Sequence, residues 1–348
     1  MAYAAIPKPS LYMNTTLYTG TGAIQAITGV EFQPDLNWTK CRTATQSHVV
    51  TDAVRGVTET LYTNATQAET TEANGLTAFG ADGFTVGTSD MWSDNTETFV
   101  SWNWKANGAG SLNEVGSLDS TVSVNTTAGF SIVKWTNGTS SVQTIGHGLG
   151  AVPKMIIMKV TGATGGWNTY HTSIGNTHGL YLNSTAASED NDAFWNDTSP
   201  TSTVFTTGTN GNLINNTLVA YCFADVKGYS RFSSYVGNGS ANGTFVYTGF
   251  KPAYVMVKNT GATESWHIVD NKINPFNPMD TNLFPNTNGA EVTASGGTGY
   301  DINMLSNGFK VETSDSTFNT SGNEYIYMAF AEEPLVANVG ASIPATAR

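Results

Sequence analysis

The chain has 348 residues and a net charge of −12, and only 12% of its residues are charged. This acidic balance disfavours binding to nucleic-acid phosphates, and no apolar run approaches the roughly 20 residues of a membrane helix. Thr, Asn, Ser and 36 Gly residues replace the charged residues that favour helices. We therefore expect a soluble, globular, all-β protein without membrane insertion, and residues 1–10 do not resemble a secretion signal.

The chain contains two cysteines, Cys41 and Cys222. A small secreted domain held by disulfides usually contains more cysteines at closer spacing. We expect both side chains to be buried as small apolar groups without a bond between them. A single Cys41–Cys222 disulfide is the alternative.

After an N-terminal arm at residues 1–9, one phrase occurs three times along the chain. In each copy a proline stands six residues before a lysine: Pro34 and Lys40, Pro153 and Lys159, and Pro252 and Lys258. A strand tolerates proline at its first residue, where the missing N–H breaks no ladder bond. Each phrase therefore predicts the start of a buried strand.

The surrounding segments recur in the same order as the phrase. Gly- and Asn-rich turns precede each copy, a second strand follows it, and an apolar strand closes it at residues 98–104, 217–223 and 324–330. This pattern is typical of antiparallel sandwiches of the jelly-roll or lectin-like kind. It predicts three tandem β-sandwich repeats at residues 10–106, 129–227 and 228–333, followed by a C-terminal arm at 334–348.

Residues 107–128 lie between the first two predicted repeats and are rich in Gly, Ser and Thr. We interpret them as a linker. Within it, residues 120–124 alternate between polar and apolar side chains, which favours an extra hairpin strand.

Two loops carry an aromatic residue beside polar groups. Trp195 is followed by Asn196 and Asp197, and Trp92 stands between two aspartates. An aromatic ring flanked by amide and carboxylate groups can stack on a sugar ring and bond its hydroxyls. We predict glycan binding by these four residues, and the alternative is an aromatic plug over one end of the sandwich.

Glu189, Asp190 and Asp192 form the densest group of oxygen ligands in the sequence. Such a loop can hold Ca²⁺, although it lacks the ligand spacing and glycine of an EF-hand. A solvated, metal-free loop is the alternative, and no other cofactor is expected.

The sequence offers no catalytic motif. No Gly-x-Ser-x-Gly elbow is placed between a strand and a helix, and no pair of carboxylates is singled out for glycoside cleavage. His48 and His267 occupy similar places in their copies, which favours a packing role or a shared hydrogen bond. We predict that the protein is not an enzyme.

Three stretches, residues 146–159, 120–133 and 274–278, resemble a family of virion-associated β-repeat proteins of marine tailed bacteriophages, of the tail-fibre or decoration type. In larger members, such units stand beside concanavalin-A-like lectin domains. The resemblance covers nearly the whole chain and supplies no catalytic residue.

The resemblance implies a non-enzymatic structural protein of the virion, assembled in the host cytoplasm. The leading expectation is a tail-fibre or tip component that attaches to a host-surface glycan. The alternative is a capsid decoration or spike that binds the phage shell, and the third is a polysaccharide-degrading enzyme. Expected partners are other virion proteins and further copies of the same chain, since particle components often assemble around symmetry axes.

Overall fold

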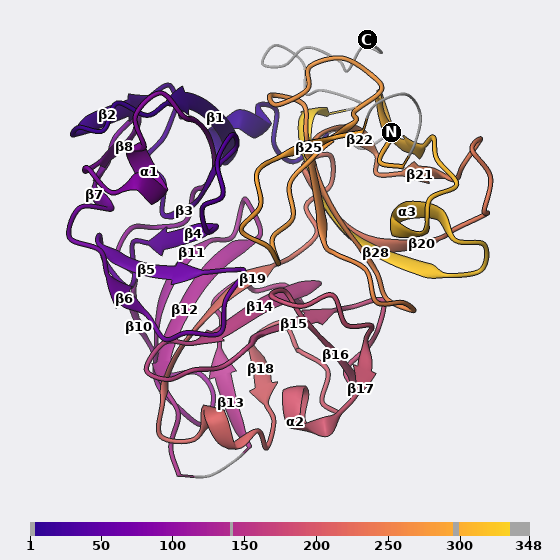
Figure 1. Cartoon of the computed structure of the whole chain (residues 1–348). Helices are drawn as coiled ribbons and strands as arrows, with labels where there is room; N and C mark the ends of the chain where they lie inside the picture. Colours follow the sequence, from indigo (N-terminus) through magenta and orange to yellow (C-terminus); the bar gives the residue numbers. More distant parts are fainter. Residues whose placement is uncertain (1–3, 140–141, 295–298, 335–348) are drawn as a thin grey trace.

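The computed structural model describes residues 4–139, 142–294 and 299–334 (Figure 1). Strands dominate these ranges. The helices are short: α1 at Asp90–Ser93, α2 at Asp192–Trp195 and α3 at Ser316–Asn319, with 3-10 turns η1 at Pro9–Leu11 and η2 at Gly211–Leu213. None of the helices in the described ranges is long and apolar enough to cross a membrane. The prediction of an all-β protein is confirmed.

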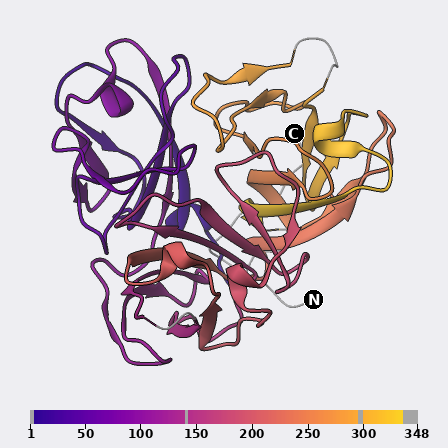
Figure 2. The ribbon, with the colours of Figure 1, turned by 60° about the horizontal axis from the view of Figure 1, so that its bottom comes forward.

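The sheets divide among three regions of the chain, because each sheet takes its strands from only one of them. We call residues 8–106, 107–227 and 228–334 the first, second and third regions. Figure 2 shows them as three coloured sectors, indigo to purple, magenta to pink, and orange to yellow.

The first region contains a six-stranded and a three-stranded sheet. The larger sheet has the order β1-β9-β3-β4-β5-β6 and the smaller has the order β2-β8-β7. The strand bounds are β1 Met13–Thr19, β2 Gln25–Thr28, β3 Leu36–Cys41, β4 Val49–Asp52, β5 Glu59–Tyr62, β6 Thr70–Thr71, β7 Leu76–Gly80, β8 Gly83–Val86 and β9 Thr98–Trp104.

The second region contains an eight-stranded and a two-stranded sheet. The larger has the order β10-β11-β12-β19-β14-β15-β16-β17, and β13 pairs with β18 in the smaller. The bounds are β10 Ser111–Asn113, β11 Ser120–Asn125, β12 Phe130–Thr136, β13 Gln143–Gly146, β14 Met155–Val160, β15 Trp167–His171, β16 His178–Tyr181, β17 Glu189–Asp190, β18 Val204–Thr207 and β19 Thr217–Phe223. Residues 107–128 thus supply the hairpin β10–β11 at the edge of this larger sheet.

The third region contains a four-stranded sheet, β20-β28-β22-β23, a three-stranded sheet, β21-β27-β26, and the pair β24-β25. The bounds are β20 Ser230–Val236, β21 Phe245–Tyr247, β22 Phe250–Asn259, β23 His267–Asp270, β24 Thr281–Asn282, β25 Val292–Thr293, β26 Ile302–Leu305, β27 Gly308–Val311 and β28 Glu324–Pro334.

The three prolines stand at matching ladder positions in the larger sheets. The residue two positions after each proline pairs with the aromatic residue of the closing strand: Leu36 with Trp104, Met155 with Phe223, and Tyr254 with Phe330. Pro34 and Pro153 precede their strands, as predicted. Pro252 instead lies inside β22, where the ladder register shifts on both sides of it, because this strand begins two residues earlier, at Phe250.

One apolar core is shared by all three regions. Trp104, Phe223 and Phe330 contact one another there, with ring centroids 6.3 Å, 5.8 Å and 6.1 Å apart for Trp104–Phe223, Trp104–Phe330 and Phe223–Phe330. Each region also has a smaller core cluster of its own. The central strands of the larger sheets, such as β3, β14 and β22, are therefore buried on both faces, whereas the smaller sheets cover only the outer clusters.

Polar contacts link the regions in a cycle. Tyr221 in the second region donates its hydroxyl to Asp52 in the first, at 2.8 Å. His171 in the second region lies 3.3 Å from the carbonyl oxygen of Tyr327 in the third. Trp102 in the first region donates its indole N–H to Asp270 in the third, at 3.0 Å. Asp52, His171 and Asp270 are the last residues of β4, β15 and β23. Each region thus contacts the next through the same position, and the third region contacts the first.

The described part of the predicted N-terminal arm, residues 4–9, is packed against the rest of the protein. Ile6 is fully buried in the shared core, and the Ala5 N–H donates to the Lys227 carbonyl at 3.2 Å. Of the predicted C-terminal arm, Pro334 ends β28, and residues 335–348 lie outside the described residues.

Candidate functional site

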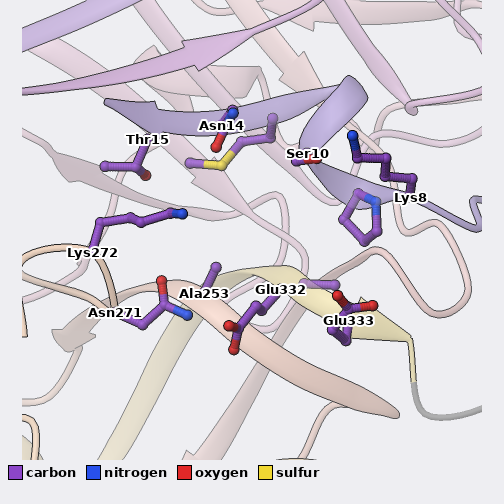
Figure 3. Close-up of a pocket in the computed structure, with 12 residues that line it drawn as sticks. Lys8, Ser10, Asn14, Thr15, Ala253, Asn271, Lys272, Glu332 and Glu333 are labelled. Carbon is purple, nitrogen blue, oxygen red and sulfur yellow. The ribbon is translucent and has the colours of Figure 1, made fainter. Parts of the chain in front are cut away.

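A hollow of about 210 Å³ opens between the first and third regions (Figure 3). Met13, Asn14 and Thr15 of the edge strand β1 form one side of it. The opposite side is formed by residues of the third region: Ala253, Asn271, Lys272, Ala331, Glu332 and Glu333. It is therefore built where the third region closes onto the first.

Small side chains on β22 and β28 explain why the hollow is open. Ala253 follows Pro252 within the register irregularity of β22, and its carbonyl accepts the N–H of Asn271 at 2.9 Å. Asp35 and Lys154 follow the other two prolines, so only the third region has a methyl group at this position. The missing side-chain volume contributes to the space beside β1.

Asn271 and Lys272 give the hollow its polar character. Asn271 is 7% exposed, and its Oδ1 has no hydrogen-bond partner among the described residues. The Lys272 side chain extends towards the same space, beside Thr15 and Asn271 (Figure 3). A buried acceptor without a donor is uncommon in proteins, because losing its bonds to water costs free energy.

The buried carboxylate of Asp270 holds the two sides together. Its Oδ2 accepts from Thr15 Oγ1 at 2.7 Å and from Trp102 Nε1 at 3.0 Å, and its Oδ1 accepts from the Lys272 N–H at 2.7 Å. Burial raises the pKa of Asp270, and the hydrogen bond from Thr15 acts in the opposite direction. Its bonds position Thr15 and Lys272 on either side of the hollow.

Lys8 and Glu332 of the lining form ion pairs with residues beside it. Lys251 forms an ion pair with Glu332 at 2.6 Å, and Lys8 forms one with Glu31 at 2.7 Å. The hydrogen bond from Lys8 is the largest cause that lowers the pKa of Glu31. The lining contains no His or Cys, and its donors and acceptors are suited to hydrogen bonding with a small polar molecule.

The structure places the predicted aromatic site residues in the core. Trp195 is 1% exposed and Trp92 is 0% exposed, and Trp195 packs edge-on against Tyr170, with ring centroids 5.7 Å apart. Neither indole presents an open face, so this geometry favours the alternative, an aromatic plug. Asn196 ends α2 in the left-handed conformation, and Asp197 beside it is exposed.

The structure does not bring Glu189, Asp190 and Asp192 together as ligands. Glu189 and Asp190 are successive exposed residues of β17, which point to opposite faces of a strand, and Asp192 begins α2. Across residues 4–139, 142–294 and 299–334, no group of three or more His, Cys, Asp or Glu side chains is placed to hold a metal ion.

His48 and His267, which the sequence suggested as equivalent, differ by one residue when the ladders of their regions are aligned. His267 pairs with Val257, whereas Val49, the residue after His48, pairs with the matching Thr39. Both histidines are buried. His48 Nδ1 accepts from Trp38 Nε1 at 3.0 Å, and His267 Nδ1 lies 3.2 Å from Asn282 Oδ1, as a packing and hydrogen-bonding role requires. Cys41 and Cys222 are buried and not bonded, which confirms that prediction.

Sequence reasoning missed two pairs of residues. Asn271 and Lys272 stand where the first region has Ala53 and Val54 and the second has Thr172 and Ser173. Phe245 and Tyr247 stand where the other regions have Ala26 and Thr28, and Thr144 and Gly146. These matches follow from the ladder registers. These residues could have been found from the sequence because, at these positions, the third copy differs in residue type from the other two.

The chain belongs to the family described as Domain of unknown function (DUF7483), whose family model matches residues 8–334. This match covers all three regions, from the residue before η1 to the last residue of β28. Comparisons with curated proteins and with solved structures gave no match.

Proposed function

We propose that this protein is a non-enzymatic structural component of a bacteriophage particle, in a tail fibre or tail tip, and that it attaches to a glycan on the host surface. The resemblance of residues 120–133, 146–159 and 274–278 to virion proteins supports the location. A rigid body with a shared core suits a part that must transmit force without changing shape.

The architecture in this proposal is three tandem β-sandwich repeats closed into a ring. Three features support it: the common order β1-β9-β3-β4, β12-β19-β14-β15 and β20-β28-β22-β23, the shared register around the prolines, and one outer core cluster in each region. The repeats begin and end as the three regions do, with the hairpin β10–β11 as an addition to the second.

One observation carries the attachment role: an exposed aromatic pair on β21. Phe245 is 45% exposed and Tyr247 is 60% exposed, whereas Val246 between them is buried. Alternate residues of a strand share a face, so both rings lie on the outside of the third region, on Cα atoms roughly 7 Å apart. Exposed neighbouring aromatic rings mark interaction surfaces, and their flat faces stack on sugar rings.

The cyclic arrangement favours a second candidate, a capsid decoration or spike. Three similar regions around one core give the chain an approximate threefold form, and particle components occupy symmetry axes. In either role we expect other virion proteins as partners and assembly in the host cytoplasm. We also propose self-association, which light scattering of the purified protein measures.

The test compares the wild type with the double variant Phe245→Ala/Tyr247→Ala and with the control Leu112→Ala. Leu112 is 66% exposed in the second region, far in sequence from β21. We expect the wild type to bind cells of a phage-sensitive host and to block phage adsorption. The double variant should lose at least tenfold in binding, while Leu112→Ala should bind as the wild type does.

Other outcomes identify the alternatives. Protein that labels phage shells and ignores cells supports the decoration role and contradicts attachment. Release of reducing sugar from host polysaccharide would reveal an enzyme. Wild-type protein that binds neither cells nor shells contradicts both structural roles.

A further inference from the structure

We propose that the hollow between the first and third regions binds one neutral sugar residue. This inference rests on the proposed attachment function and names the class of ligand, a neutral pyranose within a host glycan. The hollow is distinct from the exposed aromatic pair on β21, none of whose residues lines it.

The size of the hollow suits a single sugar ring. Its volume of about 210 Å³ is smaller than the roughly 300 Å³ at which pockets begin to enclose drug-sized ligands. The side chains of Met13, Ala253 and Ala331 supply small apolar surfaces for the C–H groups of a ring. A disaccharide would have to extend its second residue into solvent.

The polar groups suit a ligand that carries both donors and acceptors at neighbouring atoms. Asn271 Oδ1 is buried and lacks a donor among the described residues, and a sugar hydroxyl supplies one. The Lys272 ammonium group points towards the same space (Figure 3) and can donate to a second hydroxyl or to the ring oxygen. Thr15 also lines the hollow, and because its hydroxyl donates to Asp270, the lone pairs of its oxygen are left as acceptors.

The charges favour a neutral ligand over an acidic one. Lys8 and Lys251 are already paired with Glu31 and Glu332. The lining contains two lysines and two glutamates, so its formal charges sum to zero, and the whole chain carries a net charge of −12. A uronic acid would therefore meet repulsion that a hexose does not.

Of the three described regions, the third alone has this pair of side chains after its second strand. At the ladder positions of Asn271 and Lys272, the first region has Ala53 and Val54 and the second has Thr172 and Ser173. Substitution by these residues is compatible with the fold elsewhere in the same protein. Asn271→Ala and Lys272→Ser are therefore suited to removing the ligand contacts while keeping the strand pairing.

The experiment titrates the full-length protein with single sugars and follows saturation-transfer NMR. The probes are glucose, galactose and mannose as neutral hexoses, glucuronate as an acidic sugar, and glycerol as a small polyol. We expect at least one hexose to bind saturably and more tightly than glucuronate and glycerol. Asn271→Ala and Lys272→Ser should each weaken hexose binding at least tenfold. Ala253→Leu should fill the hollow and abolish binding. The control Ser173→Ala should change the affinity less than twofold.

The proposal is overturned if no hexose binds, if glucuronate or glycerol binds as tightly, or if folded Asn271→Ala and Lys272→Ser proteins bind like the wild type. Thermal unfolding shows which variants are folded, and one folded variant of the two is enough for this test. Cell attachment that depends on Phe245 and Tyr247 without hexose binding would leave the attachment function standing and reject the hollow. Hexose binding in the hollow without cell attachment would reject the attachment function instead.

Discussion

Three lysines illustrate how this fold uses individual residues. Lys40, Lys159 and Lys258 are 0%, 1% and 0% exposed, and their ammonium groups donate to backbone carbonyls. Lys159 donates to Gly165 O at 2.8 Å and to Thr66 O of the preceding region at 3.1 Å. Lys258 likewise reaches Thr185 O of the preceding region, at 3.2 Å. In the second and third regions the lysine of the recurring phrase therefore joins neighbouring regions, whereas Lys40 donates to carbonyl oxygens of its own region.

Burial of Lys159 predicts a pH-dependent stability. Burial lowers its pKa to about 8, below the value of about 10.4 of an exposed lysine. Between these values the unfolded chain binds more protons than the folded one, so the unfolding free energy rises with pH. From pH 8 to pH 9.5 this lysine should contribute a rise of about 1.5 kcal/mol. Urea unfolding of Lys159→Met should lack that part of the rise, and an unchanged slope would contradict the burial of its charge.

At the residue scale, sequence predicted what depends on neighbours along the chain. The strand starts after Pro34 and Pro153 and the buried, unpaired cysteines are examples. It could not predict that Trp92 and Trp195 are buried, because the burial of an aromatic residue in a loop depends on which distant strands lie behind it. Asn271 was missed for the same reason: its partners across the hollow come from β1, more than 250 residues earlier.

At the element scale, the smaller sheets share a glycine in one cross-strand pair. Thr28 pairs with Gly83 and Tyr247 with Gly308, whereas in the second region Gly146 pairs with Val204. The glycine thus stands on the opposite strand in the second region. Gly83 and Gly308 therefore begin β8 and β27, whereas the matching strand β18 begins with Val204.

Substitution of Gly308 should be costly. A Cβ atom there would lie 2.0 Å from the Val246 carbonyl oxygen, and the same atom at Gly83 would lie 1.9 Å from that of Ile27. Gly308→Ala must separate β27 from β21, and we expect it to lower the unfolding free energy by about 2 kcal/mol or more. Gly211→Ala, where nothing lies within 4 Å, should change it by less than about 0.5 kcal/mol. Equal effects in chemical denaturation would be inconsistent with this packing.

At the scale of the whole molecule, the three regions share one core, so we expect one cooperative unfolding transition. Trp104→Ala, Phe223→Ala and Phe330→Ala each remove one of three mutually contacting rings. Each should destabilise the entire chain by about 3–5 kcal/mol. Calorimetry together with near- and far-ultraviolet circular dichroism tests this expectation. A variant that melts one region in a separate, earlier step would show that the regions fold independently.

Composition and the recurring phrase sufficed to predict an all-β chain, but not its cyclic closure. The closing strands β19 and β28 are apolar on both faces, which is typical of strands covered on two sides. Strand β9 is also buried on both faces, although Ser101 and Asn103 lie on one of them. Such strands need cover on both faces. The sequence does not identify this cover as the other two regions, because each region alone shows only the need for a partner.

One continuous chain forms all three regions, which has a consequence for how the protein can diversify. In an assembly of three identical chains, every amino-acid change is present three times, and a favourable change on the surface gains from multivalent binding. Here a change is present once. Asn271 and Lys272 can therefore specialise one junction while Ala53, Val54, Thr172 and Ser173 keep the other two as they are. The chain therefore lacks the multivalent binding of a symmetric trimer, but each of its three junctions can acquire a different binding site.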